Sequence, residues 1–138
     1  MSAPSLWRTL ASGLSDTDDI IGCIVYETAQ GTVDLADDGT VEPLGVIVNL
    51  QNDKALIAGP GEEAFCRLSE DFEYSDSKIF GATTDGKAAV FTPAAGTVTT
   101  ATMTWTAGYI KLPGAVKGAS GSMQPCIVMP QLQIVKAS

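Results

Sequence analysis

The chain has 138 residues, with 8 basic and 16 acidic side chains, so its formal net charge is −8. This length suits one domain with a single core. Hydrophobic residues make up 45% of the chain but aromatic residues only 7%, so we expect a thin core that assembly with other chains would help to stabilise. The basic residues are scattered singly on an acidic chain, which argues against binding to nucleic acid or to an anionic membrane.

The numbers of cysteine and histidine residues limit which disulfide bonds and metal sites the chain can form. Cys23, Cys66 and Cys126 are odd in number and far apart, which is a poor disulfide framework and fits a reducing compartment. We interpret them as small core residues. The chain has no His, which removes most zinc and copper ligand sets. No segment reaches the ~18–20 apolar residues needed to cross a bilayer, and no signal-peptide pattern precedes Asp16, so we expect a soluble protein made in the cytoplasm.

Residues 1–19 form a polar lead with isolated apolar anchors at Leu6, Trp7, Leu10 and Leu14. This spacing matches one face of a helix, so a short amphipathic helix is one prediction. The alternative is a mobile arm that becomes ordered only against a partner. In either case an exposed Trp would be a natural contact element, because aromatic anchors dominate the energetics of interfaces.

From residue 20 onward, short β-prone runs alternate with turn residues, which indicates a β-sandwich or barrel. We therefore predict an all-β fold: a single small β-barrel or sandwich-like domain over residues 20–138, preceded by the N-terminal arm or helix. The predicted strands cover residues 20–26, 32–35, 44–49, 54–57, 63–68, 79–83, 88–91, 98–106, 109–112, 125–129 and 132–135.

Two Asp-Gly pairs, Asp38-Gly39 and Asp85-Gly86, stand between predicted strands. Asp-Gly is a strong hairpin signal because both central residues of a type I′ turn need positive φ. The first pair leads through a Pro into a β-branched run that contains Gly45. We expect Gly45 to mark a bulge or a close approach of another backbone.

The segment 97–105 is rich in Thr and is polar on much of both faces. A strand with this pattern suits a solvent-exposed edge or an interface better than a buried centre. Thr100, Thr102 and Trp105 are therefore candidate contact residues, although Trp105 also fits a core position.

No motif indicates catalysis. Glu62 and Glu63 are adjacent on a predicted strand, so their side chains point to opposite faces and not toward one substrate. Without His, a Ser nucleophile needs a Lys base, and Ser75 precedes Lys78 without the companion motifs of such enzymes. We predict no enzyme activity, no catalytic residue, no cofactor and no metal. An incidental cation at the acidic residues 16–19 is the alternative.

Four segments follow one another in a recognisable order: Thr32-Val33-Asp34-Leu35, Asp38-Gly39-Thr40, Pro43-Leu44-Gly45-Val46-Ile47-Val48, and Gly81-Ala82-Thr83-Thr84-Asp85-Gly86-Lys87-Ala88. Together with residues 108–112 and 127–130, this order resembles the small decoration, or cement, proteins of tailed-phage capsids, which include the lambda-type head-stabilising proteins. The Trp-containing N-terminal segment and the long Thr-rich strand depart from that pattern.

The resemblance implies a structural protein of the virion. Such a protein binds the major capsid protein on the outer surface of an expanded icosahedral head, sits as a homotrimer at threefold or quasi-threefold positions, and stabilises the shell. Part of this contact would come from an extended N-terminal arm. The predicted contact residues are Leu6, Trp7, Arg8, Leu10, Leu14, Thr100, Thr102 and Trp105.

Two other functions remain open. One is a minor virion or tail-fibre-associated β module. The other is a carbohydrate-binding β module, for which Trp7, Trp105 and Tyr109 are the candidate aromatic residues.

Overall fold

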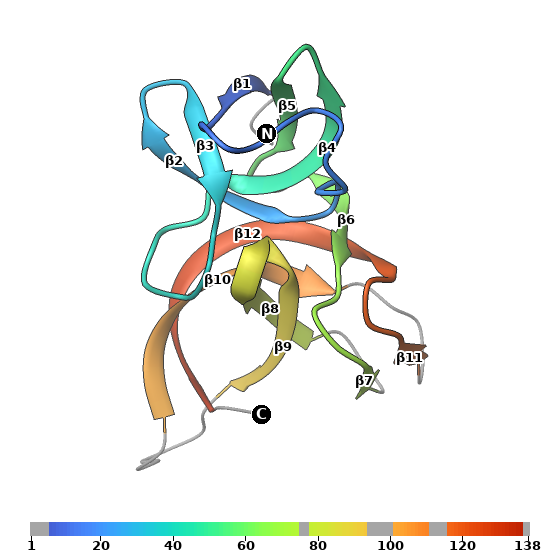
Figure 1. The fold of residues 1–138 in the computed structure, drawn as a ribbon. Helices are drawn as coiled ribbons and strands as arrows, with labels where there is room; N and C mark the ends of the chain where they lie inside the picture. Colours follow the sequence, from blue (N-terminus) through green and yellow to red (C-terminus); the bar gives the residue numbers. More distant parts are fainter. Residues whose placement is uncertain (1–5, 75–77, 94–100, 111–115, 137–138) are drawn as a thin grey trace.

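A computed structural model describes residues 6–74, 78–93, 101–110 and 116–136 (Figure 1). Within these ranges the chain is nearly all β, and its helical structure is limited to one short 3₁₀ turn, η1 (Thr84–Gly86). The strands form a closed five-stranded barrel and a second five-stranded sheet that lies against it. The predicted all-β, barrel- or sandwich-like fold class is confirmed.

The barrel occupies the first half of the chain. Its strands follow the order β1-β3-β2-β4-β5, with β1 parallel to β3 and antiparallel to β5. The β4–β5 hairpin turns at Asn52 and Asp53, whose φ values of 54° and 56° are those that a type I′ turn requires. The five strands are β1 (Leu6–Leu10), β2 (Ile24–Ala29), β3 (Thr32–Leu35), β4 (Gly45–Gln51) and β5 (Lys54–Ala58).

Strand β1 corrects the prediction for the N-terminus. Residues 6–10 are neither a helix nor an arm awaiting a partner, because β1 pairs with β3 on one side and β5 on the other and so closes the barrel. Leu10 is 7% exposed and packs in the barrel interior, whereas Trp7, on the alternate face of the strand, is 42% exposed. The apolar spacing fits a helical face, but pairing with two partner strands overrides it.

The second sheet has the order β10-β8-β9-β12-β6, with a further pairing of β10 with β12. Two additional short strands, β7 and β11, pair with each other. The bounds of these elements are β6 (Glu63–Arg67), β7 (Phe72–Tyr74), β8 (Lys78–Ala82), β9 (Ala88–Pro93), β10 (Ala101–Ile110), β11 (Val116–Gly118) and β12 (Met123–Lys136).

Strands β10 and β12 are each one long strand where the sequence predicts two. Their register shifts between Thr106 and Gly108, so Met129 and Pro130 lie opposite a single residue of β10. Proline is tolerated at such a bulge because the ladder is interrupted there. Gly108 has φ 154°, and a Cβ at this position would collide with the Ile127 carbonyl oxygen. The bulge lets both strands continue past Gly108 and Pro130, where the sequence predicts that each strand is interrupted.

The two Asp-Gly pairs have different roles. Asp85 and Gly86, with φ of 60° and 74°, turn the predicted hairpin between β8 and β9. The predicted hairpin at Asp38-Gly39 is wrong, because β2 lies between β3 and β4 in the barrel. This loop instead crosses to the second sheet, where the Trp105 N–H donates to the Gly39 carbonyl at 2.9 Å. The signal for a turn is local, whereas the pairing of the flanking strands is not.

Two clusters of buried side chains hold the molecule together. One lies inside the barrel and includes Leu10, Val33, Ile47 and Ile57. The other is shared between the barrel and the second sheet: Ile24, Ala36, Val46 and Ala58 from the barrel half pack with Leu68, Phe80, Ile110 and Val128 from the second half. Gly45 marks a close approach within the barrel, as expected, because a Cβ there would collide with the Ala58 carbonyl oxygen.

Candidate interaction surfaces

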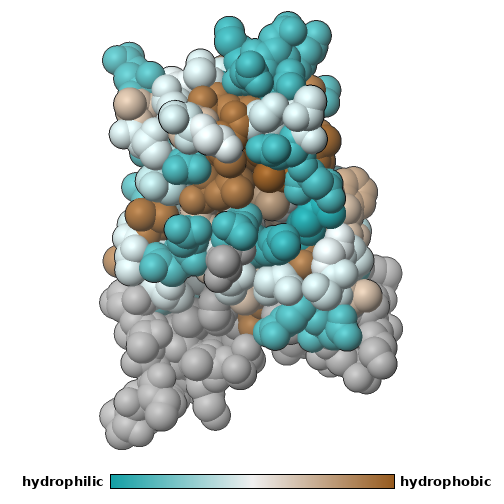
Figure 2. Space-filling model, viewed as in Figure 1, coloured by the Kyte–Doolittle hydropathy of each residue, from teal (hydrophilic) through white to brown (hydrophobic). Residues whose placement is uncertain are grey.

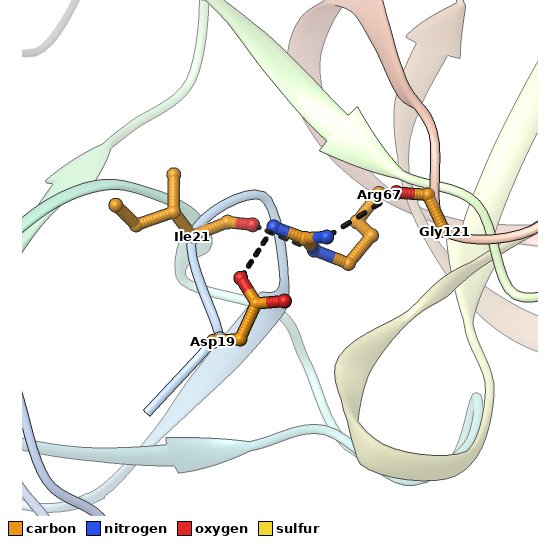
Figure 3. A network of polar contacts seen from close by, with 4 residues as sticks. All are labelled: Asp19, Ile21, Arg67 and Gly121. Carbon is orange, nitrogen blue, oxygen red and sulfur yellow. Dashed lines mark hydrogen bonds and ion pairs between the residues drawn. The ribbon is translucent and has the colours of Figure 1, made fainter. Parts of the chain in front are cut away.

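Arg67 joins the two halves of the molecule (Figure 3). Its Nε donates to the Ile21 carbonyl at 3.0 Å and its Nη1 to the Gly121 carbonyl at 3.2 Å. Its Nη2 pairs with Asp19 Oδ1 at 3.0 Å. The Arg67 side chain is only 16% exposed, so these contacts satisfy a largely buried guanidinium. Arg67 therefore acts as a structural clamp between the loop before β2 and the turn before β12.

The acidic residues 16–19 have structural partners. Asp18 Oδ2 accepts from the Ser15 N–H at 2.8 Å, and Asp16 Oδ2 accepts from the Asp53 N–H at 3.1 Å. Asp19 pairs with Arg67. In the described part of the chain, no group of three acidic, Cys or His side chains is placed to hold a metal ion.

A groove of about 730 Å³ runs across the boundary between the barrel and β12. Its apolar lining includes Tyr26, Leu44 and Met129, and its acidic residues are Glu27 and Glu42. We call this surface the acidic groove. Three prolines also line it, namely Pro43, Pro60 and Pro130. Proline has a fixed φ and no N–H, so much of the wall is stiff and carries few exposed backbone donors.

Arg8 connects β1 to the rim of this groove. Its Nε lies 3.6 Å from Glu27 Oε2. The Arg8–Glu27 ion pair therefore lies at the rim of the acidic groove. Glu42 is exposed and supplies negative charge to the groove.

A second hollow, of about 480 Å³, lies between the barrel and strands β6 and β12. Its lining is mostly apolar and includes Ile47, Val48, Phe65 and Cys126. Phe65 is 55% exposed. This apolar hollow is a second place where the boundary between the halves opens to solvent.

A third hollow, of about 320 Å³, lies at the tip of the β4–β5 hairpin. It is lined by Trp7, Gln51, Asn52 and Lys54.

On the face seen in Figure 2, apolar surface gathers over the barrel between hydrophilic patches. Apolar contact area is therefore available on the barrel surface.

The predicted contact residues of the N-terminal segment separate into exposed and buried positions. Leu6 and Trp7 are 46% and 42% exposed and available for contact. Arg8 and Leu14 are half-buried, and Leu14 packs against the barrel core. Leu10 is buried in that core and cannot reach a partner.

The predicted contact residues of the Thr-rich segment belong to the other sheet. Thr100 lies outside the described residues, and Thr102 pairs through its backbone with Val135. Trp105 is half-buried, opposite Leu132. The structure therefore places the two predicted sets on different sheets.

Sequence reasoning missed several exposed apolar residues. Leu132 is 50% and Met129 is 37% exposed, and Phe65 is the most exposed of the large apolar side chains among the described residues. The alternation around Phe65 indicates a strand, but it does not reveal which face of that strand is covered.

No model of a known protein family matches the chain, and no curated protein matches it either. Among the described residues, no helix has the length and apolar character needed to cross a membrane.

Proposed function

We propose that this chain is a capsid decoration protein. In this proposal it binds the major capsid protein as a homotrimer on the outer surface of an expanded icosahedral phage head and stabilises the shell. The chain is made in the host cytoplasm and becomes part of the virion. The observation that carries the proposal is the acidic groove, which offers a stiff, partly apolar docking surface shared by both halves of the molecule.

The chemistry of the acidic groove favours a protein segment as its occupant. Three of its lining residues are prolines, so little conformational freedom is lost when a partner docks. Tyr26 and Met129 supply apolar and polarisable contact area, and Glu42 adds negative charge. The complementary partner is an extended segment that carries apolar side chains and at least one Lys or Arg.

Net charge and multivalency are consistent with this role. A chain with a net charge of −8 is suited to the outside of a shell, away from packaged DNA. Each groove needs only modest affinity, because engagement of one protomer makes the remaining contacts of a trimer intramolecular. The exposed Leu6 and Trp7 supply further contact area on the barrel.

Co-sedimentation with purified heads of its own phage tests the proposal. We expect the protein to bind expanded heads and not immature ones, and to sediment as a trimer, or as a monomer that becomes trimeric on heads. Failure to bind any expanded head would overturn it.

A charge reversal locates the binding surface. Glu42→Lys should weaken binding to heads by at least about tenfold, because it opposes the positive charge expected on the partner. Glu70→Lys makes the same change at another exposed position and should bind normally. Equal binding by both variants would contradict a role for the acidic groove.

A carbohydrate-binding function is a second candidate, supported by the hollow at the hairpin tip. Trp7 presents an exposed aromatic side chain beside the amides of Gln51 and Asn52. An aromatic ring with neighbouring amides can stack on a sugar and bond its hydroxyl groups. A glycan array combined with the fluorescence of Trp105→Phe protein, which retains only Trp7, tests this function. Array hits with a fluorescence change would support it, and no hits with unchanged fluorescence would remove it.

A further inference from the structure

Strand β2 has one edge that is only partly paired. On one side it pairs with β3 along most of its length, and on the other it pairs with β4 only through Ile24 and Val25. There the Leu44 N–H donates to the Val25 carbonyl at 2.8 Å, and the residue before Leu44 is Pro43, which has no N–H with which to continue the ladder. The edge of β2 beyond Val25 therefore opens on the acidic groove, which Glu27 lines.

The backbone of Glu27 faces this open side. In an antiparallel sheet, successive residues of a strand direct their N–H and C=O groups to opposite sides. The Ile24 carbonyl accepts from the Ala36 N–H, on the β3 side, and the Val25 carbonyl accepts from the β4 side. By this alternation Tyr26 bonds toward β3 and Glu27 faces the groove. Over the parts of the chain that the structure describes, no backbone bond reaches Glu27 from the groove side. This exposed residue thus presents one donor and one acceptor to a partner.

We propose that an extended segment of the major capsid protein adds to the barrel as a strand, antiparallel to β2, and bonds with the Glu27 N–H and C=O. This inference rests on the proposed capsid function and defines how the partner sits in the acidic groove. Addition of a strand to a sheet edge is a recurrent way to bind an extended peptide, because backbone bonds supply affinity and side-chain contacts supply specificity. The direction follows from β4, which runs antiparallel to β2 and whose place the segment continues.

The two faces of the added strand meet different surroundings. The residue opposite Glu27 has its side chain on the face where Arg8 Nε already lies 3.6 Å from Glu27 Oε2, so an uncharged side chain suits it. Its two neighbours have their side chains on the other face, where Tyr26 packs against the shared core, so apolar side chains suit them. Met129 adds apolar area to the groove. The exposed Glu42 attracts a Lys or Arg that flanks these three residues.

Charge favours this occupant over a second copy of the same chain. An unpaired strand edge can also pair with the same edge of another molecule. Two copies would each bring a net charge of −8 and an exposed Glu42 to the contact, and these charges repel. A segment with a basic residue gains from the same charges.

Amide hydrogen exchange tests the proposal on the wild-type protein, alone and bound to expanded heads of its own phage. Mass spectrometry with fragmentation resolves single residues. In the free protein we expect fast exchange at Glu27 and slow exchange at Tyr26, which pairs with Asp34. On heads, exchange at Glu27 should slow by at least about tenfold, because its N–H gains an acceptor.

Two results of the exchange experiment would overturn the proposal. Slow exchange at Glu27 in the free protein would mean that a second copy or another part of the chain already covers the edge. Unchanged exchange at Glu27 on heads would mean that no strand is added there.

A proline substitution tests the backbone bond separately from the side chain. Glu27→Pro removes the N–H that faces the groove and no bond between β2 and β3, so the variant should fold. Glu27→Ala is the matched control, because it loses the same carboxylate and keeps the N–H. We expect Glu27→Pro to bind expanded heads at least about tenfold more weakly than Glu27→Ala, with the same circular dichroism. Equal binding by the two variants would overturn the proposal. If Glu27→Pro does not fold, the exchange experiment decides.

The outcomes separate strand addition from capsid binding itself. Heads that bind the wild type, bind Glu42→Lys weakly, and bind Glu27→Pro as well as Glu27→Ala would leave the capsid function standing and remove the added strand. Heads that bind none of these proteins would contradict the proposed function, and the added strand falls with it.

Discussion

The barrel and the second sheet bury their side chains in different ways. The barrel surrounds its own cluster, which includes Leu10, Val33 and Ile57. The second sheet has no such separate cluster among the described residues, since Phe80 and its neighbours pack together with Ile24 and side chains near it from the barrel half. The barrel therefore provides part of the core of the second sheet, and damage to the barrel should affect both halves.

Removal of β1 should have the largest effect on the stability of the two halves. Deletion of residues 6–10 leaves β3 and β5 with unpaired edges and removes Leu10 from the barrel core, so we expect loss of the cooperative thermal transition and aggregation. If residues 6–10 formed an arm or a surface helix, their deletion would leave the rest of the protein folded. Trp7→Ala is the control, because it keeps the strand and loses an outward-facing side chain. A deleted chain that melts like the wild type by circular dichroism would contradict the role of β1.

Truncation of one residue in each cluster compares the two cores. Phe80 is fully buried and Ile57 is 3% exposed. We expect Phe80→Ala to lower the free energy of unfolding by about 3–5 kcal/mol and Ile57→Ala by about 2–5 kcal/mol. Urea titration measures both. A loss below 1 kcal/mol for Phe80→Ala would contradict a shared core at that position.

Removal of the Arg67 clamp between the halves should have a smaller effect on the free energy of unfolding. Arg67→Met removes the guanidinium contacts to Ile21, Gly121 and Asp19, and we expect a loss of about 1–3 kcal/mol in the free energy of unfolding. Asp19→Asn changes only the ion pair, whose carboxylate is 86% exposed, and should cost under about 1 kcal/mol. Equal losses for the two variants would show that the backbone contacts of Arg67 contribute nothing.

The sequence allowed the fold class and most strands to be predicted because their signals are local. Alternation and β-branched runs locate β3 at its observed bounds, and positive-φ residues mark the turn at Asp85-Gly86. The N-terminal strand was missed because Leu6, Trp7 and Leu10 also fit a helical face. Only pairing with β3 and β5 distinguishes the two structures, and that pairing depends on residues distant in the sequence.

The candidate surfaces were harder to predict. The acidic groove combines Tyr26, Glu42, Pro60 and Met129 from four separate segments, and no sequence spacing relates them. The exposure of Phe65 likewise depends on how β6 pairs with β12. Trp7 was predicted as an exposed contact residue because aromatic anchors dominate the energetics of interfaces, and its side chain is exposed in the structure.

The smallest predicted effect concerns the loop that crosses from the barrel to the second sheet. Hydrogen bonds from the Thr40 hydroxyl and N–H lower the pKa of the Asp38 carboxyl. A depressed carboxyl pKa contributes stability above the unfolded-state pKa, and this contribution is lost as the pH falls through the folded-state pKa. Thr40→Val removes the hydroxyl bond, so the pKa of Asp38 should rise toward its ordinary value in an NMR titration. An unchanged pKa would contradict this role for Thr40.

The dependence of the second sheet on the barrel is tested most directly by unfolding two single-Trp proteins. Trp7 lies on β1 of the barrel and Trp105 on β10 of the second sheet, so Trp105→Phe and Trp7→Phe proteins each report on one half. Each fluorescence transition in urea is compared with the circular dichroism of the same protein. The shared core predicts that the fluorescence and circular dichroism midpoints coincide in both proteins. A Trp105 transition that persists after the barrel has unfolded would contradict it.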